Sequence, residues 1–339
     1  MNLTKKLLIV LFSGFLVVGC APQSQVSPEF PAPRVDLYVI DSSISAVKDD
    51  KNSTIKLFER VENRILQDIS DSALGSPTME LNGDLMEGKS PVGFYLQQLT
   101  NRASENQIVQ IKDLQGSQNI WDKVNSESYG LNSTNLNILW NKLQQISGEI
   151  KNFQGNCQDE VFNSLSGQSV TKDEKKTLAL MLCDETEGSI SRLEDFKSKL
   201  DLFVQSTGGS PGSDIFGMLI NTNQWIKTLT SKDNQKIKFN LIILSDMVHD
   251  ADSDKNLNTR IAGLDSSAAK DLGNKDALEL NISFPENVDI YVIGIGAFGK
   301  NYTEKADFTQ TLTNYWTGFF ESGNANVFFT PSLDEVNLG

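Results

Sequence analysis

Histidine and cysteine are scarce in this chain, which has one histidine, His249, and three cysteines among its 339 residues. A single imidazole excludes zinc sites built from several histidines, and it allows a Ser-His-Asp triad only through that one ring. No Cys-x-x-Cys pair occurs, so nothing supports a cysteine metal cluster. We expect His249 to be structural, because a lone histidine beside acidic residues needs no chemical role.

Positive charge is also in short supply, with 30 lysines and arginines against 44 aspartates and glutamates and a formal net charge of −14. This balance would repel the phosphates of nucleic acids, although it is compatible with a cation site. We expect no nucleic-acid partner and no nucleotide ligand. The apolar share of 39%, with 18 Phe and four Trp, is enough for a substantial core.

Residues 1–19 have the features of an export signal. Two lysines precede the apolar stretch 7–18, which is too short to cross a bilayer comfortably. The stretch ends in Val-Val-Gly before Cys20 and resembles a bacterial lipoprotein processing site. The resemblance implies cleavage before Cys20, a palmitate-type lipid on that cysteine, and anchoring to a membrane of the cell envelope, on its periplasmic or extracellular face. An ordinary secretory signal with an incidental cysteine is the alternative.

The remainder of the chain divides into a short tether and a long folded body. Residues 20–33 are rich in Ser and Pro, which is typical of an extended linker. Residues 34–339 contain no apolar run of membrane length, so we expect the body to be soluble and held by lipid alone. Because an exported protein meets an oxidising compartment, we expect a disulfide between Cys157 and Cys183, with two buried free thiols as the alternative.

Short, continuous apolar segments predict buried strands separated by helical patterns. The predicted buried strands are 35–40, 239–244 and 288–295. A further strand is expected late in the chain at 326–329, and weaker candidates are 79–81 and 108–111. Apolar residues at helical spacing follow the first strand, between residues 53 and 70. This order predicts an α/β fold of the Rossmann-like, doubly wound kind with a mostly parallel sheet.

The middle of the body, about residues 115–205, shows helical periodicity and no strong strand. Its apolar residues recur at three- and four-residue steps, and Thr171 to Glu174 have the form of a capping box. We favour an inserted helical lobe that interrupts the 34–339 domain, because a single wound sheet does not need so many consecutive helices. The alternative is that these helices simply cover the sheet.

Polar side chains follow the first predicted strand at once, in the pattern Asp41-x-Ser43-x-Ser45. Open α/β sheets place their ligands at the carboxyl ends of strands. One carboxylate and two hydroxyls offer hard oxygen, which suits Mg²⁺, Mn²⁺ or Ca²⁺ and not zinc. Asp246 ends another predicted strand, and a hydroxyl of the glycine-rich loop 208–213 could converge on the same ion. The alternative is that the serines cap the next helix and Asp41 bonds backbone amides.

At this point the chain resembles the von Willebrand factor type A domain family. The matching pieces are the Asp41 motif, Gly212-Ser213-Asp214-Ile215 at the start of a helix, Asp246, and the strand at 288–296 with its glycine turn. The resemblance covers residues 34–70 and 206–335. It implies a metal-ion-dependent adhesion site, usually filled by Mg²⁺, in a domain of that family's fold.

The resemblance also assigns roles to the residues of this site. It implies direct coordination by Ser43 and Ser45, with Asp41 and Asp246 acting directly or through water. Ser213 stands where the family usually has threonine, and both residues present a hydroxyl. Ser210 is the alternative loop ligand, although the spacing to the following helix favours Ser213. Met247, after Asp246, departs from the glycine often found there.

Such a site favours binding over catalysis, so we expect no enzyme. With few carboxylates the ion stays electrophilic, and a Glu or Asp of a partner can replace a bound water. The partner is expected to be an envelope or surface protein. One alternative is a metal-dependent hydrolase with His249 or Asp250 as the base. Another is a structural lipoprotein with a non-functional site. The acidic stretch 250–254 is expected to be a solvated loop at the rim.

Overall fold

The structure is a computed structural model, and most of the chain from Pro31 onward is described. Cys20 and Ser45 lie outside the described residues, so the lipid attachment and the second serine of the Asp41 motif have no structural counterpart below. The described residues are 31–43, 53–71, 74–75, 79–81, 84–86, 88–102, 107–126, 129–207, 210–233, 237–251, 256–295, 306–336 and 338.

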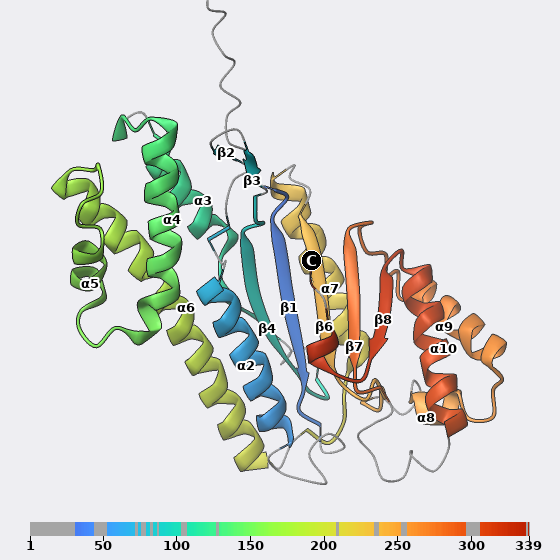
Figure 1. Ribbon diagram of the computed structural model, residues 1–339. Helices are drawn as coiled ribbons and strands as arrows, with labels where there is room; N and C mark the ends of the chain where they lie inside the picture. The colour runs from blue at the N-terminus through green and yellow to red at the C-terminus, as the bar shows by residue number, and fades with distance from the viewer. Residues whose placement is uncertain are drawn as a thin grey trace, which may run out of the picture.

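A six-stranded sheet forms the centre of the molecule, in the order β5-β4-β1-β6-β7-β8 (Figure 1). The strands are β1 (Arg34–Asp41), β4 (Val92–Leu99), β5 (Ile108–Lys112), β6 (Lys238–Leu244), β7 (Val288–Ile293) and β8 (Asn326–Thr330). All neighbours pair in parallel except β4 and β5. Counted along the chain this is the doubly wound order 3-2-1-4-5-6, whose switch point lies between β1 and β6. The predicted fold class is confirmed.

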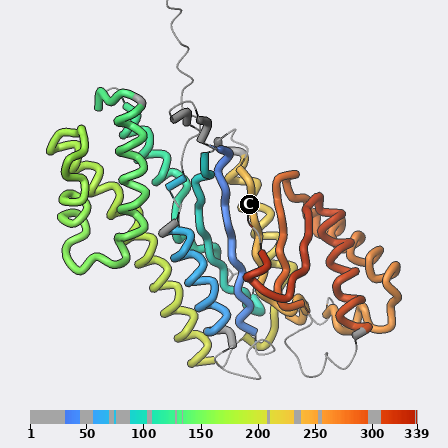
Figure 2. Tube along the Cα trace, in the orientation of Figure 1, coloured from blue at the N-terminus to red at the C-terminus, as the bar shows by residue number. Residues whose placement is uncertain are grey.

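The strand β1 shows why both faces of the sheet are covered. Successive side chains of a strand point to opposite faces, so Val35, Leu37 and Val39 enter one core while Tyr38 and Ile40 enter the other. The helix α7 (Ile215–Asp233) packs on the first face, together with α9 (Ser266–Glu279) and α10 (Ala306–Ser322). The helix α2 (Ser53–Asp71) and part of α6 (Lys172–Thr207) cover the second face (Figures 1 and 2).

One interior strand, β4, is absent from the sequence-based expectations. Its apolar run is interrupted by Gly93, Gln97 and Gln98, which hides the continuous pattern of a buried strand. Gln97 is nevertheless fully buried, because the hydroxyl of Thr222 in α7 donates to its side-chain oxygen at 3.3 Å. The weak prediction at 108–111 corresponds to the edge strand β5. That at 79–81 corresponds to β2 (Met79–Leu81), which pairs only with β3 (Asp84–Met86).

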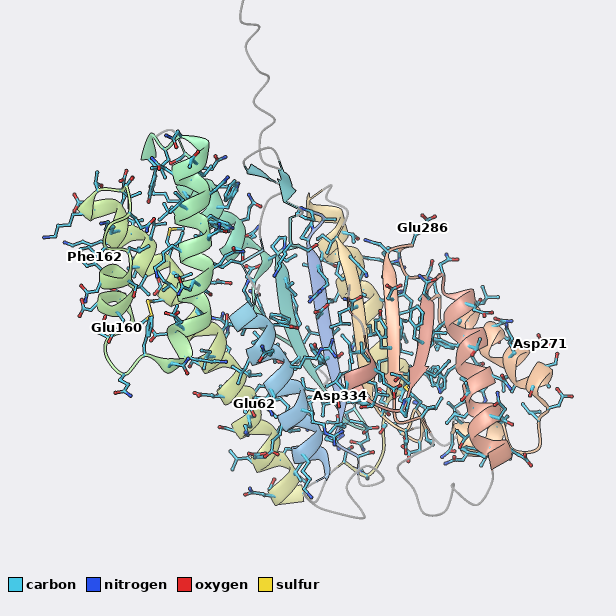
Figure 3. All side chains as sticks on the ribbon, in the orientation of Figure 1. Glu62, Glu160, Phe162, Asp271, Glu286 and Asp334 are labelled. Atoms are coloured by element: carbon cyan, nitrogen blue, oxygen red, sulfur yellow. A yellow bond between two sulfur atoms is a disulfide. The ribbon has the colours of Figure 1, made fainter. Side chains whose placement is uncertain are left out.

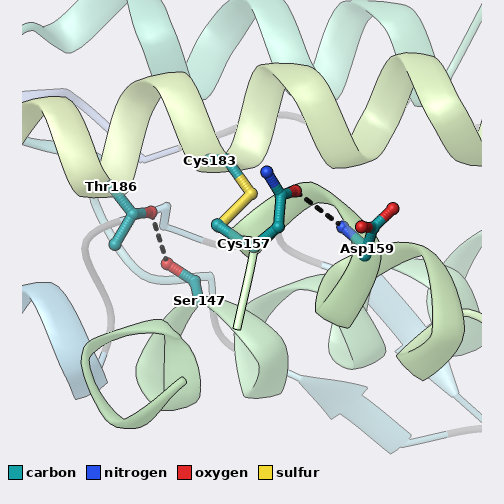
Figure 4. Close-up of a disulfide and its surroundings, with 6 residues drawn as sticks. Ser147, Cys157, Asp159, Cys183 and Thr186 are labelled. Carbon is teal, nitrogen blue, oxygen red and sulfur yellow. Dashed lines mark hydrogen bonds between the residues drawn. A yellow bond between two sulfur atoms is a disulfide. The ribbon is translucent and has the colours of Figure 1, made fainter. Parts of the chain in front are cut away.

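A helical lobe with its own core lies beside the β5 edge of the sheet (Figure 1). It comprises α3 (Leu114–Val124), α4 (Ser133–Glu149), η3 (Ile150–Asn152), α5 (Cys157–Ser164) and the first part of α6. Trp121 and Trp140 meet edge to face in this core, 5.0 Å apart. Cys157 and Cys183, the expected pair, are joined in a disulfide between α5 and α6 (Figure 4).

The long helix α6 connects the lobe to the sheet. It begins with the expected capping box, in which the Thr171 amide donates to Glu174 at 2.6 Å and the Glu174 amide donates to the Thr171 hydroxyl at 3.3 Å. Its first part belongs to the core of the lobe, whereas Leu193, Phe196 and Leu200 pack against the sheet. The remaining short elements are α8 (Leu257–Arg260) and η5 (Leu333–Glu335). None of the helices in the described ranges combines the length and apolar character that crossing a membrane requires.

Candidate metal site at the carboxyl ends of β1 and β6

The carboxylate of Asp41 is the centre of the site and is held by groups from three separate segments. Its Oδ1 accepts the Ser43 backbone N–H at 2.9 Å. The Ser213 hydroxyl donates to both carboxylate oxygens, at 2.9 and 3.0 Å, and the Ser245 hydroxyl donates to Oδ2 at 2.7 Å. The Ser43 hydroxyl is also hydrogen-bonded to this carboxylate, which lowers its pKa. Asp41 therefore gathers serine hydroxyls around itself at the end of β1.

The sheet explains why these segments meet. β1 and β6 are parallel neighbours with Ile40 opposite Leu244, so the residues that follow each strand emerge side by side. The loop before α7 is attached to the same edge, because the Ser210 N–H donates to the carbonyl of Ser42 at 2.8 Å. Just beyond, the Asp214 N–H donates to the carbonyl after β4 at 2.8 Å. The site thus lies at the topological switch point, where doubly wound sheets bind ligands.

Asp41 is a buried carboxylate that has no cationic partner among the described residues. Asp41 is 1% exposed, and burial raises the pKa of its carboxyl group. In the described part of the chain, no lysine or arginine forms an ion pair with it. Acidic side chains such as Asp271 and Glu286 instead project from the surface (Figure 3). The negative charge of Asp41 is therefore desolvated, and the described residues stabilise it by hydrogen bonds.

Two other buried aspartates in the same fold do have cationic partners. Asp36 pairs with Arg34 at 3.1 Å, and Asp276 pairs with Arg260 at 2.6 Å. Even with Arg34 beside it, burial raises the pKa of Asp36 to about 6. A buried charge needs an opposite charge, and among the described residues Asp36 and Asp276 have one beside them whereas Asp41 does not.

Asp246 and Met247 shape the loop that follows β6. Asp246 is 1% exposed, and its Oδ1 accepts the Val248 N–H at 3.0 Å. Met247 adopts the left-handed conformation with φ 61°, which glycine adopts at lower cost. Its side chain is fully buried, and its carbonyl accepts the Trp316 indole N–H at 2.9 Å. The loop therefore makes the turn directly after Asp246 without glycine.

The structure distinguishes between the two loop serines. Ser213 faces Asp41, as described above. The Ser210 hydroxyl instead donates to the Gly212 carbonyl at 2.7 Å and to the Asn101 side chain at 3.2 Å, and it accepts the Asn101 N–H at 2.8 Å. Of the residues proposed from sequence, Ser43 and Ser213 are thus hydrogen-bonded to Asp41, and Asp246 follows Ser245 in the chain.

Two residues of the site were missed or assigned a different place by sequence reasoning. Ser245 was not considered, although its position directly before Asp246 at a strand end was a usable signal. Asp250 was expected in a solvated rim, but its Oδ1 accepts the Ser213 N–H at 2.7 Å. Burial raises the pKa of Asp250, and the nearby negative charge of Asp41 raises it further.

His249 lies in an aromatic cluster rather than at an open surface. The residue is 2% exposed, and its ring packs on Phe216 with centroids 4.4 Å apart. Its Nδ1 is 3.9 Å from the Asp214 carboxylate. The imidazole ring is therefore packed in the interior, and little of it is open to solvent.

Two short sequence patterns formally match other chemistries. Residues 208–212 read Gly-x-Ser-x-Gly, but a nucleophile elbow needs a strand before the serine, and α6 precedes it here. Residues 83–90 read Gly-x4-Gly-Lys-Ser, but a phosphate-binding loop must open a helix, and the strand β4 follows here. Neither pattern therefore lies in the structural context that its chemistry requires.

The residues present suit a hard divalent cation. Their donor atoms are carboxylate and hydroxyl oxygens, which Mg²⁺, Mn²⁺ and Ca²⁺ prefer. Within the described ranges, no three His, Cys, Asp or Glu side chains converge as a metal cluster. A cation here would therefore depend on the serine hydroxyls as well as the carboxylates, with water completing its shell.

Comparisons with known proteins add little beyond this geometry. No protein-family model matches the chain, and no curated protein matches it. Two solved structures of proximal thread matrix protein 1 from the mussel byssus resemble it at 13% identity and a TM-score of 0.35, and one of them has a zinc-occupied MIDAS motif. The matches cover 91% of this chain but 46% of the mussel protein, so the chain spans less than half of its length.

Proposed function

We propose that this protein is a metal-ion-dependent binding module of the von Willebrand factor type A kind, which captures an acidic side chain of a partner protein. The single observation that carries the proposal is the state of Asp41. It is a buried carboxylate at the switch point of the sheet, surrounded by serine hydroxyls, with no basic side chain paired to it in the described part of the chain. A divalent cation supplies the charge that this arrangement lacks.

The residues of the site would contribute different ligand groups to such an ion. Ser43 and Ser213 offer hydroxyl oxygens, and Asp41 and Asp246 offer negative charge from the ends of adjacent strands. Ser45 belongs to the same set on sequence grounds alone. When bound, the cation supplies a coordination position that a partner carboxylate can take in exchange for water. Mg²⁺ is the first choice, and Mn²⁺ or Ca²⁺ suits the same donors.

The setting that we propose is a bacterial cell envelope. The leader and Cys20 support a lipid anchor. Two or more acyl chains attached to one protein hold it stably at a membrane. The partner is then an envelope or surface protein that presents a Glu or Asp. The buried position of His249, packed against Phe216, weighs against the hydrolase alternative, because a general base must reach its water.

Partner capture with matched serine variants tests the proposal. The chain is used to recover proteins from an envelope extract in Mg²⁺, in EDTA, and in EDTA followed by excess Mn²⁺. Capture is expected to disappear with EDTA and to return with Mn²⁺. Ser213→Ala should abolish capture, whereas Ser210→Ala, three residues away and bonded to Asn101, should retain it. Capture that is indifferent to the chelator, or lost equally in both variants, contradicts the proposal.

A further inference from the structure

Asp250 forms a bracket between the two loops that build the site. Its side-chain Oδ1 accepts the backbone N–H of Ser213 at 2.7 Å. Its own backbone N–H donates in return to the carbonyl of Ser213 at 3.4 Å. The loop after β6 is therefore hydrogen-bonded to the loop before α7 at Ser213, the residue whose hydroxyl faces Asp41.

Gly212 shows how closely the Asp250 carboxylate approaches the backbone of the loop before α7. A Cβ added to Gly212 would lie 2.5 Å from Oδ1 of Asp250 and 3.1 Å from its Cγ. Side-chain carbons essentially never approach other atoms within 3.0 Å. The carboxylate of Asp250 thus rests against the bare backbone of Gly212, and any larger residue there must displace it.

The bracket determines the direction of the Ser213 hydroxyl. Ser213 is 1% exposed, so its backbone N–H has little access to water and needs a protein acceptor. With that amide fixed by Asp250, the hydroxyl reaches both oxygens of Asp41 at 2.9 and 3.0 Å. We infer that Asp250 is a positioning residue of the cation site, acting as a hydrogen-bond acceptor that holds Ser213 in place. The inference rests on the proposed function.

This role makes a specific demand on the chemistry at position 250. An acceptor oxygen is required, whereas a negative charge is not. Asn keeps the oxygen and removes the charge, while Ala removes both. Gly212→Ala places a methyl group against the Asp250 carboxylate and so displaces it without changing any polar atom.

The test compares Asp250→Ala, Asp250→Asn and Gly212→Ala with the parent chain and with Ser210→Ala as the control. Mn²⁺ affinity is measured by titration, and hydrogen exchange of the Ser213 amide is measured without metal. Loss of a supporting group typically lowers metal affinity about 10–100-fold. We expect that loss, with faster exchange, in Asp250→Ala and Gly212→Ala. Asp250→Asn should stay within about threefold of the parent on that scale, with its amide protected.

The outcomes separate this inference from the proposed function. If the parent binds Mn²⁺ and Asp250→Ala binds it equally, the inference fails and the proposed function stands. If Asp250→Asn loses as much affinity as Asp250→Ala, the charge matters and Asp250 is not a pure acceptor, which also overturns the inference. If the parent binds no Mn²⁺, both fail. Circular dichroism confirms folding, and Gly212→Ala provides a second route if Asp250→Ala does not fold.

Discussion

Replacing Asp41 by Asn should stabilise the protein without metal and remove its response to metal. In the parent, the buried carboxylate accepts hydrogen bonds from Ser43, Ser213 and Ser245 but has no cationic partner in the described part of the chain. Asn keeps one acceptor oxygen and turns the other position into a donor. The Ser245 hydroxyl can then accept instead of donating, and the Ser213 hydroxyl keeps one of its two hydrogen bonds, to the remaining oxygen.

The expected direction of the change in unfolding free energy follows from two opposing contributions. Hydrogen bonds to a charged group are worth about 1.5–3 kcal/mol each, against about 0.5–1.5 for neutral ones. Desolvating the carboxylate costs several kcal/mol, on the order of the sum of those bonds. Because the pKa of Asp41 is raised, desolvation outweighs the hydrogen bonds. We therefore expect Asp41→Asn to have a larger free energy of unfolding than the parent in EDTA.

Metal should then act on the two proteins differently. A ligand at 100 times its Kd stabilises the folded state by about 2.7 kcal/mol. The parent should gain about that much in Mg²⁺, and Asp41→Asn should gain nothing. Urea unfolding in EDTA and in Mg²⁺ measures both effects, with the exposed Asp271→Asn as a control that should change neither. Lower stability of Asp41→Asn in EDTA, or an equal gain in Mg²⁺, would refute the reasoning.

Three further predictions concern the scaffold. Because burial raises the pKa of Asp36 from 3.8 to about 6, the free energy of unfolding should fall as pH rises from 4 to 7. Across that range, urea unfolding should show the parent losing about 3 kcal/mol more than Asp36→Asn. Parallel pH curves for the two proteins would contradict this. Replacing Cys157 and Cys183, 26 residues apart, by Ala should cost about 3.5 kcal/mol of unfolding free energy by loop entropy, and no loss would contradict the account. Met247→Gly should relieve about 1 kcal/mol of left-handed strain but lose about 2–5 kcal/mol of packing, a net destabilisation measurable as a lower Tm; a higher Tm would show that strain dominates.

The sequence was informative where burial leaves a continuous pattern. β1, β6 and β7 are covered on both faces, so their apolar runs were recognisable, and the polar residues directly after β1 and β6 marked the site. β4 was missed because buried glutamine breaks its pattern, and the hydrogen bond from Thr222 in α7 to Gln97 is visible only in the structure. The side of the sheet on which each helix packs required the structure.

The fine geometry of the site depended on contacts between distant segments. The bond from Ser245 to Asp41 spans 204 residues, and that from Ser213 to Asp250 spans 37. Nothing in local composition signals such partners, so Asp250 was expected to be a solvated rim residue. The preference for Ser213 over Ser210 was accessible from spacing to α7, and the hydroxyl positions agree with it.

Anomalous diffraction from crystals soaked in Mn²⁺ tests the central claim most directly. The account predicts one strong peak at the carboxyl ends of β1 and β6, bonded to the hydroxyl oxygens of Ser43 and Ser213 and adjoining the carboxylates of Asp41 and Asp246. The contrary result is a crystal in full Mn²⁺ with no peak at that edge and with Asp41 still hydrogen-bonded to its serines. That outcome would show that hydroxyls alone satisfy the buried carboxylate.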